Sequence, residues 1–356
     1  MHDETKETCI KIMTAIMFVQ PDLNLRSVGA SLKDWRDSQW KLFCEGEEPN
    51  PSAIPEAEKN FCRLQDLFAR LGGVQACINS IRSPNAAIVQ RGLSLAVTLL
   101  RNGRRSIQDE FLKTLNFPGS QPFFEQLKRI LEAGVLKARQ RAVGQHEELD
   151  DDMQLCVLVF KLMRRLFLAQ HQPLQDLFRV QRLNRVSINL ICEAIAPLAG
   201  FISSLGNFNP QISAGVEIAF EMLAASMSGH NDANQQELAS SGLLDLCDRI
   251  FDPRLGSSQR DRQGLRRRTS SYSYSGRESR RVVPVDDADS NSKYGGGGRG
   301  WEEEAGAAAA LSRAKRAATR CVTSFLEGQA YPSGVVNQVL TTLQWLPLQE
   351  QVISRE

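Results

Sequence analysis

The sequence predicts an all-α protein built as an armadillo-like helical solenoid with a disordered insertion. First, a glutamine, a glycine and a cysteine recur at one spacing in two distant helix-patterned stretches, LQDLFARLGGVQACINSI and NQQELASSGLLDLCDRIF. Second, apolar residues follow helical spacing through most of the chain, and no stretch alternates with the period of a strand. Helices that repeat in this way bury their apolar faces against neighbouring units. The two copies of the pattern are Gln65, Gly72, Cys77 and Gln235, Gly242, Cys247.

Composition indicates a globular chain without a strong overall charge. Of the 356 residues, 42% are apolar, and the net charge of +2 gives the whole molecule no preference for nucleic acid or an anionic membrane. The eight cysteines are scattered without a C-x-x-C pair, so we expect reduced core thiols of a cytosolic protein, with a disulfide framework as the less favoured alternative. We expect no membrane span, because no segment approaches the required length of about 20 apolar residues. The first residues also lack the pattern of a secretory signal.

The first two expected regions lie at 1–55 and 56–145. Residues 1–55 begin with a helix at 3–19 and continue into a polar, proline-bearing, irregular segment. Within 56–145, the stretch EAEKNFCRLQDLFARLGG ends at a glycine pair, and VQACINSIRS and AAIVQRGLSLAVTLLRNG follow it closely. Three helices joined by short turns form one armadillo-like unit. RSIQDEFLKTL and QPFFEQLKRILEAGVLKARQRAV predict two further helices.

The second half divides into 153–252, 253–307 and 308–350. Met153–Ala169 is apolar on nearly all sides, which predicts a helix packed centrally between others. Pro210 and Gly229 suit the start and end of a later helix. Residues 253–307 are rich in serine, arginine and glycine and predict a disordered basic insertion in a turn of the second copy of the pattern. Residues 308–350 predict C-terminal helices that complete the solenoid.

The order of motifs resembles the cytosolic helical region of intracellular calcium-release channels, the inositol trisphosphate receptor and ryanodine receptor family. NAAIVQRGLSLAVTLLRNGRRSIQDEFLKTL, followed by Phe123 and Phe124, is similar to the family's homology domain. LQDLFRVQ, NRVSINLICEAIAPLAGFI and ANQQELASSGLLD resemble the associated domain that comes next. The resemblance implies a cytosolic regulatory scaffold, located in the cytoplasm or at the endoplasmic reticulum membrane as part of a channel complex.

The resemblance also implies a calcium site, at which this sequence departs from the family. Leu168 and Ala225 stand where the family places two glutamates, and neither aliphatic side chain supplies an oxygen ligand. Glu221, one helical turn from Ala225, is a substitute only if the helix register shifts. We therefore expect that no calcium binds here.

No motif predicts catalysis, a cofactor or a metal site. The sequence lacks G-x-G-x-x-G, P-loop, G-x-S-x-G and H-E-x-x-H patterns, and its four histidines are far apart in segments that predict surface positions. The acidic run 147–152 is either a divalent-cation loop or, as we favour, a solvated turn that stabilises the start of the next helix. We therefore expect a protein that is not an enzyme.

The insertion carries the candidate binding and modification residues. Eight arginines against two acidic residues at 259–281 give a local charge near +6, which is either a solvated linker, as we favour, or a weak contact for an anionic partner. A hydroxyl cluster after three arginines also suggests phosphorylation, which would cancel much of this charge. The anion-binding candidates are Arg266, Arg267, Arg268, Arg280 and Arg281. The phosphorylation candidates are Thr269, Ser270 and Ser271.

These observations favour a non-enzymatic scaffold that couples through protein contacts, with other channel domains or separate proteins as partners and without specific nucleic-acid binding. The alternative is a stand-alone armadillo-type adaptor that binds peptides or proteins. A downstream reading frame with paired apolar helices indicates the channel, whereas a stop after Glu356 indicates the adaptor.

Overall fold

The computed structural model describes residues 7, 9, 56–143, 151–205, 210–252, 255, 298–329 and 333–343. Apart from turns and short 3₁₀ segments, these residues are α-helical and contain no strand, which confirms the all-α prediction. Apart from positions 7 and 9, the segment expected at 1–55 lies outside the described residues. The expected disorder of the insertion also lies outside them over 256–297.

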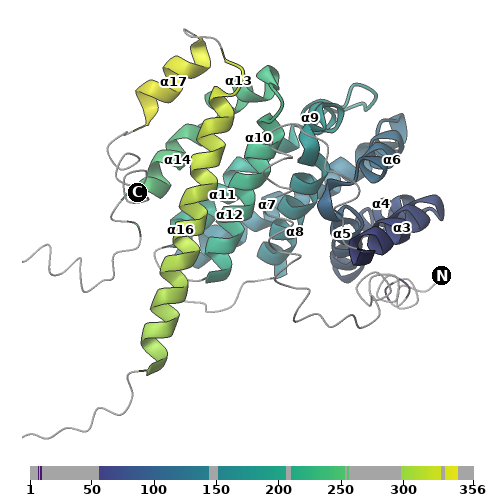
Figure 1. Cartoon of the computed structure of the whole chain (residues 1–356), viewed down its shortest axis with the longest axis horizontal. Coiled ribbons are helices and arrows are strands. Elements are labelled where there is room, and N and C mark those ends of the chain that lie inside the picture. The colour runs from purple at the N-terminus through teal and green to yellow at the C-terminus, as the bar shows by residue number, and fades with distance from the viewer. Residues whose placement is uncertain are drawn as a thin grey trace, which may run out of the picture.

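The described helices group into four consecutive three-helix units and the first helix of a fifth (Figure 1). The first unit holds α3 (Glu56–Arg70), α4 (Gly73–Ile81) and α5 (Ala86–Leu99), and the second holds α6 (Arg105–Leu115), α7 (Gln121–Val143) and α8 (Asp151–Phe167). The third unit begins with α9 (Gln172–Arg179) and ends with α12 (Pro210–Met227). Its second helix is broken into two pieces, α10 (Leu190–Glu193) and α11 (Ile195–Ser204). The fourth holds α13 (Asp232–Ser240), α14 (Leu243–Phe251) and α16 (Gly298–Leu326), and α17 (Gly334–Thr342) follows.

Equivalent helices contact one another from unit to unit. The third helices pack in the order α5, α8, α12, α16, the second in the order α4, α7, α11, α14, and the first in the order α3, α6, α9, α13, α17. Figure 1 shows this succession from α3 at one side of the molecule to α17 at the other. The solenoid remains an interpretation, and this contact order supports it.

Local sequence explains where the helices begin and turn. Asn85 accepts from Ala87 N at 2.9 Å and so caps α5, and Pro210 is the first residue of α12. The two copies of the recurring pattern are structurally equivalent, because Gly72 and Gly242 both have left-handed backbone, with φ of 84° and 85°. The cysteines five residues later are fully buried in both copies.

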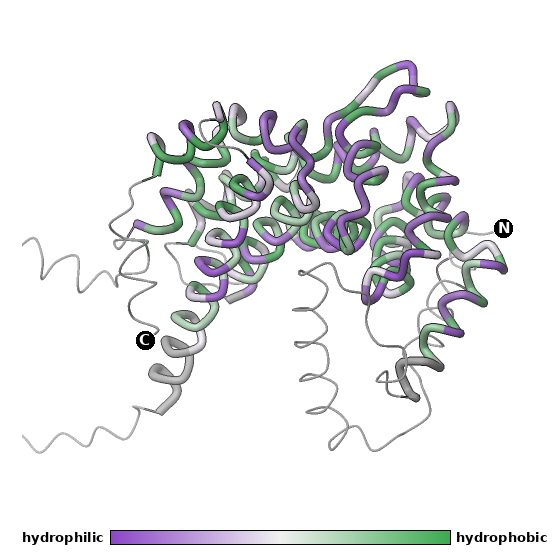
Figure 2. Tube along the Cα trace, turned by 45° about the horizontal axis from the view of Figure 1, so that its top comes forward, coloured by the Kyte–Doolittle hydropathy of each residue, from purple (hydrophilic) through white to green (hydrophobic). Residues whose placement is uncertain are grey.

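One continuous core runs through the units. Figure 2 shows hydrophobic and hydrophilic residues alternating along the helices, so that each helix has an apolar side for its neighbours. As the sequence predicted for a central helix, α8 contacts α5, α7, α9 and α12. At one junction the rings of Phe124 and Phe167 each meet Phe178 edge-on, with centroids 5.5 Å apart. This aromatic cluster joins α7, α8 and α9.

The insertion lies between α14 and α16, in the turn where the sequence placed it, but its end differs from the expectation. The sequence placed the boundary at 307, whereas α16 begins at Gly298. Glutamates 302–304 and the alanine run that follows are good helix formers, and they extend the helix through residues that composition alone marked as linker.

Candidate functional site at the ends of three long helices

Four fully buried glutamines occupy the same place in the four units. Each lies on the first helix of its unit and donates its Nε2 hydrogens to main-chain carbonyl oxygens at the end of the third helix. The last four carbonyls of an α-helix lack partners within the helix, so these end-capping glutamines satisfy groups that burial would otherwise leave unpaired. The bonds are Gln65 to Leu99 and Arg101 at 2.8 and 3.0 Å, Gln108 to Arg165, Leu166 and Leu168 at 3.1, 3.2 and 2.9 Å, Gln175 to Ala225 and Ser228 at 2.8 and 3.1 Å, and Gln235 to Ser324 and Glu327 at 2.8 and 2.9 Å.

The long helices end in left-handed turns directly after these carbonyls. Ala169 has φ of 61° after α8, and Gly229 and Gly328 have φ of 79° and 72° after α12 and α16. A left-handed alanine costs roughly 1–2 kcal/mol, which the surrounding bonds must offset. At Gly328 a β-carbon would lie 1.9 Å from Nδ1 of His230, so the site requires glycine for space as well as for backbone angle.

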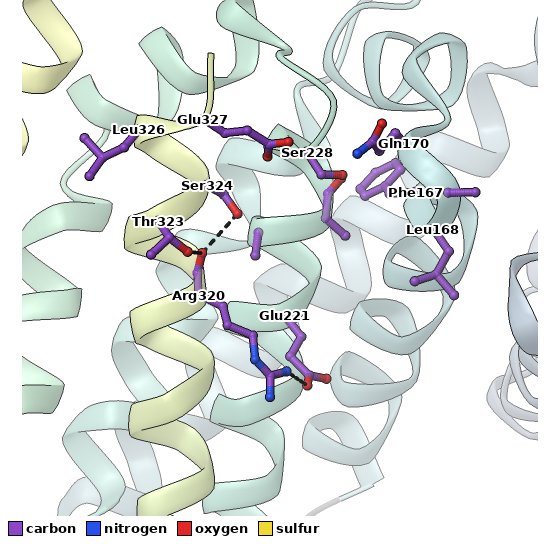
Figure 3. Close-up of a pocket in the computed structure, with 13 residues that line it drawn as sticks. Phe167, Leu168, Gln170, Glu221, Ser228, Arg320, Thr323, Ser324, Leu326 and Glu327 are labelled. Atoms are coloured by element: carbon purple, nitrogen blue, oxygen red, sulfur yellow. Dashed lines mark hydrogen bonds and ion pairs between the residues drawn. The ribbon is translucent and has the colours of Figure 1, made fainter. Parts of the chain in front are cut away.

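A pocket of about 500 Å³ lies where α8, α12 and α16 end (Figure 3). Its wall is largely apolar and includes Leu168 from the turn after α8 and Ala224 and Ala225 from α12. Glu221 lies at one end beside Arg320, and Glu327 lies near Ser228 at the other. The volume falls within the range of roughly 300–1,000 Å³ that is usual for ligand pockets.

The Glu221 carboxylate connects all three long helices. Its two oxygens meet Arg164 Nε of α8 at 3.1 Å and Arg320 Nη1 of α16 at 3.1 Å. The Glu221 side chain is 16% exposed and that of Arg164 27%, whereas Arg320 is 53% exposed, so the Arg164 pair is the better shielded from solvent. One helical turn earlier, Glu217 meets Arg313 Nε at 3.2 Å. These contacts fix α12 against both of its neighbours.

The pocket tests the calcium site that the family resemblance implies. Leu168, Ala225 and Glu221 all contribute atoms to the lining of one pocket. The residues present do not fit a calcium ion, which needs six to eight oxygen ligands. Both Glu221 oxygens are engaged by guanidinium groups, and the main-chain oxygens of Leu168 and Ala225 accept from end-capping glutamines. Among the described residues, no group of three or more metal-ligating side chains occurs.

One expectation about the histidines is wrong. We expected His171 at the surface, but its side chain is fully buried, with Nε2 3.0 Å from Asp109 Oδ1. Its Nδ1 accepts from Leu174 N at 3.4 Å, so the ring caps the start of α9 and its neutral tautomer donates from Nε2 to Asp109. Burial, followed by the nearby charge of Arg105, lowers the pKa of His171.

The cysteine expectation is met at four positions: Cys77, Cys156, Cys247 and Cys321 are buried free thiols. Burial raises the pKa of Cys77 to about 12, which makes it unreactive. Cys62 and Cys192 are half-buried and Cys9 is exposed.

The acidic run is partly described. Asp151 and Asp152 lie in the first turn of α8, as the helix-stabilising interpretation predicted, and the rest of the run lies outside the described residues. The anion-binding candidates Arg266, Arg267, Arg268, Arg280 and Arg281, together with Thr269, Ser270 and Ser271, also lie outside them.

Sequence reasoning missed two parts of this site. It found the recurring glutamine in two copies, although Gln108 and Gln175 belong to the same series; the short motifs QDEF and LQDLF that contain them were the available signal. It also missed Arg320 and Glu327, because the insertion separates them from α14 and no spacing rule relates them to Glu221.

Comparison with known proteins adds one relationship. In the described residues, no helix has both the length and the hydropathy needed to cross a membrane. No curated protein sequence matches the chain. Residues 150–251, which extend from the start of α8 to the end of α14, match the family model described as RyR and IP3R Homology associated, and this region is therefore similar to that part of the calcium-release channel family.

Proposed function

We propose that the chain is a non-enzymatic regulatory scaffold related to the cytosolic region of an intracellular calcium-release channel, and that it acts through protein contacts. The main support for the proposal is the family match over residues 150–251, because the matched region contains the whole third unit and helices from both neighbouring units. The proposal assigns 56–145 to the homology domain that precedes the matched region. It places the chain in the cytoplasm, at the endoplasmic reticulum membrane within a channel assembly.

The mechanism we propose is mechanical coupling between units. The end-capping glutamines tie the first helix of each unit to the end of its third helix, and the third helices contact one another in sequence. The Arg164–Glu221–Arg320 bridge couples three of these long helices directly. A displacement of one unit is therefore passed to the next as a small rotation of packed helices.

A second candidate is a stand-alone adaptor that binds peptides or protein partners. The pocket at the ends of α8, α12 and α16 favours it, because this cavity is lined by both apolar and charged side chains. In an adaptor, the basic insertion would be an arm controlled by phosphorylation.

The size of the native polypeptide separates the two candidates. An antibody raised against residues 232–251 is used on immunoblots of native cells, and the 3′ end of the transcript is sequenced. The channel assignment predicts a polypeptide much larger than 39.7 kDa whose additional sequence encodes paired apolar helices. A 39.7 kDa protein with a stop after Glu356, or a longer chain without such helices, contradicts it and favours the adaptor.

A further inference from the structure

The pocket at the ends of α8, α12 and α16 has a strongly uneven charge distribution. At one end, Glu221 is neutralised by Arg164 and Arg320. At the other end, the half-buried Glu327 carboxylate has no hydrogen bond or ion pair with any described side chain, and Figure 3 shows it beside Ser228 at the pocket. The negative charge that lacks a partner is therefore concentrated at the Glu327 end.

The surrounding backbone strengthens this negative potential. Three long helices present their C-terminal ends to the same cavity, and each helix end carries a partial charge of roughly −0.5. Amide hydrogens of the end-capping glutamines offset part of this charge without adding a full positive charge. An anionic ligand is disfavoured at the Glu327 end, and a calcium ion lacks the oxygen ligands it needs.

The pocket wall between the two charged ends is mainly apolar, and the hydroxyls of Thr323 and Ser324, which also line it, donate to the main-chain oxygen of Arg320. Arg320 lies on α16 and Glu327 directly follows its last residue, so the two are seven residues apart, which corresponds to about 10 Å at the rise of a helix. Ala224 and Ala225 of α12 line this space, whereas the side chain of Leu168 packs toward Gly103. A ligand that fits has an aliphatic stem of several carbons for this wall and a terminal cation for Glu327.

We infer that this pocket receives a lysine or arginine side chain from a partner peptide. The aliphatic stem packs against Ala224 and Ala225, and the cationic head binds Glu327, with the Ser228 hydroxyl oxygen as a further acceptor. The inference deepens the proposed function, since it names the chemistry of one protein contact, and it rests on the proposal that the chain works by such contacts.

Binding of defined peptides to the full chain tests the inference. The probes are fluorescent decapeptides of alanine and leucine with one central lysine, arginine, norleucine or glutamate, measured by fluorescence anisotropy up to about 1 mM, a range that includes weak contacts. Putrescine is the free-cation comparison. We expect the lysine or arginine peptide to bind about tenfold more tightly than the norleucine peptide, which keeps the stem and lacks the charge. Putrescine should bind more weakly than either basic peptide.

Variants locate the binding site on the protein. Glu327→Gln should weaken the basic peptide about tenfold, and Ala225→Trp, which fills the cavity, should abolish binding. Glu132→Gln is the matched control on α7, where the carboxylate is exposed, and it should leave binding unchanged. If Ala225→Trp does not fold, as circular dichroism would show, Glu327→Gln still decides the question.

Three results would overturn the inference: no binding of either basic peptide, equal binding of the norleucine peptide, or no effect of Glu327→Gln. Putrescine binding equal to that of the basic peptides would also overturn it, since the site would then select a free cation. The size of the native polypeptide, which tests the proposed function, does not depend on any of these measurements.

Discussion

Replacement of Gln175 by methionine probes the end-capping glutamines with little change in side-chain volume. Gln175 donates to the carbonyl oxygens of Ala225 and Ser228 at 2.8 and 3.1 Å and accepts from Asn231 Nδ2 at 3.0 Å. Methionine has a similar length and shape, so the variant removes these bonds without opening a large cavity. The change therefore isolates the polar contribution of the link between α9 and α12.

The expected loss is about 3 kcal/mol, from three hydrogen bonds of about 1 kcal/mol each. The loss of stability is reduced because Ser228 Oγ still donates to the Ala225 carbonyl oxygen at 2.9 Å in the variant. With a urea m-value of about 3 kcal/mol/M, this loss corresponds to a fall of about 1 M in the unfolding midpoint. Amide hydrogen exchange should also accelerate first in α9 and at the end of α12, where the bonds are lost.

Gln75→Met is the matched control. Gln75 is exposed and donates only to the Asn79 side chain, at 3.0 Å, so the control should change stability by less than about 0.5 kcal/mol. If Gln175→Met destabilises the chain no more than this control, the end-capping glutamines do not hold the units together in the way we describe.

Three further predictions follow from the same region. Gly328→Ala should lower the free energy of unfolding in urea by at least about 1 kcal/mol, because Gly328 has left-handed backbone and its Cβ would meet the His230 ring. Gly306→Ala, which has open space around it on α16, should raise that free energy by about 0.5–1 kcal/mol. Equal effects of the two substitutions would contradict this reasoning. Because burial lowers the pKa of His171, the folded state resists its protonation, so unfolding free energy should fall as pH drops below the unfolded value of about 6.5. His171→Asn, which retains a capping group, should reduce that slope, and an unchanged slope would refute the assignment. Micromolar calcium should not raise the melting temperature, and a rise that Glu221→Ala removes would show that the Arg164 and Arg320 contacts yield to the ion.

Short-range sequence patterns were sufficient to predict the helices and where several of them begin and turn. Apolar residues at helical spacing, Gly72 and Gly242 at left-handed turns, and Pro210 at a helix start all act over a few residues, and the structure has them where the sequence predicted. The recurring glutamine, glycine and cysteine similarly indicated two equivalent units. Propensity misplaced the start of α16, because a glycine-rich segment and an alanine helix adjoin there.

Tertiary structure alone decided which distant groups meet. His171 is buried because α6 supplies Asp109, and Glu221 is neutralised because α8 and α16 each supply an arginine. Such contacts depend on the packing of helices separated by tens of residues and, for Arg320, by the insertion. Sequence spacing carries no information about them, because the distance between two groups is set by how the helices pack and not by the length of chain that joins them.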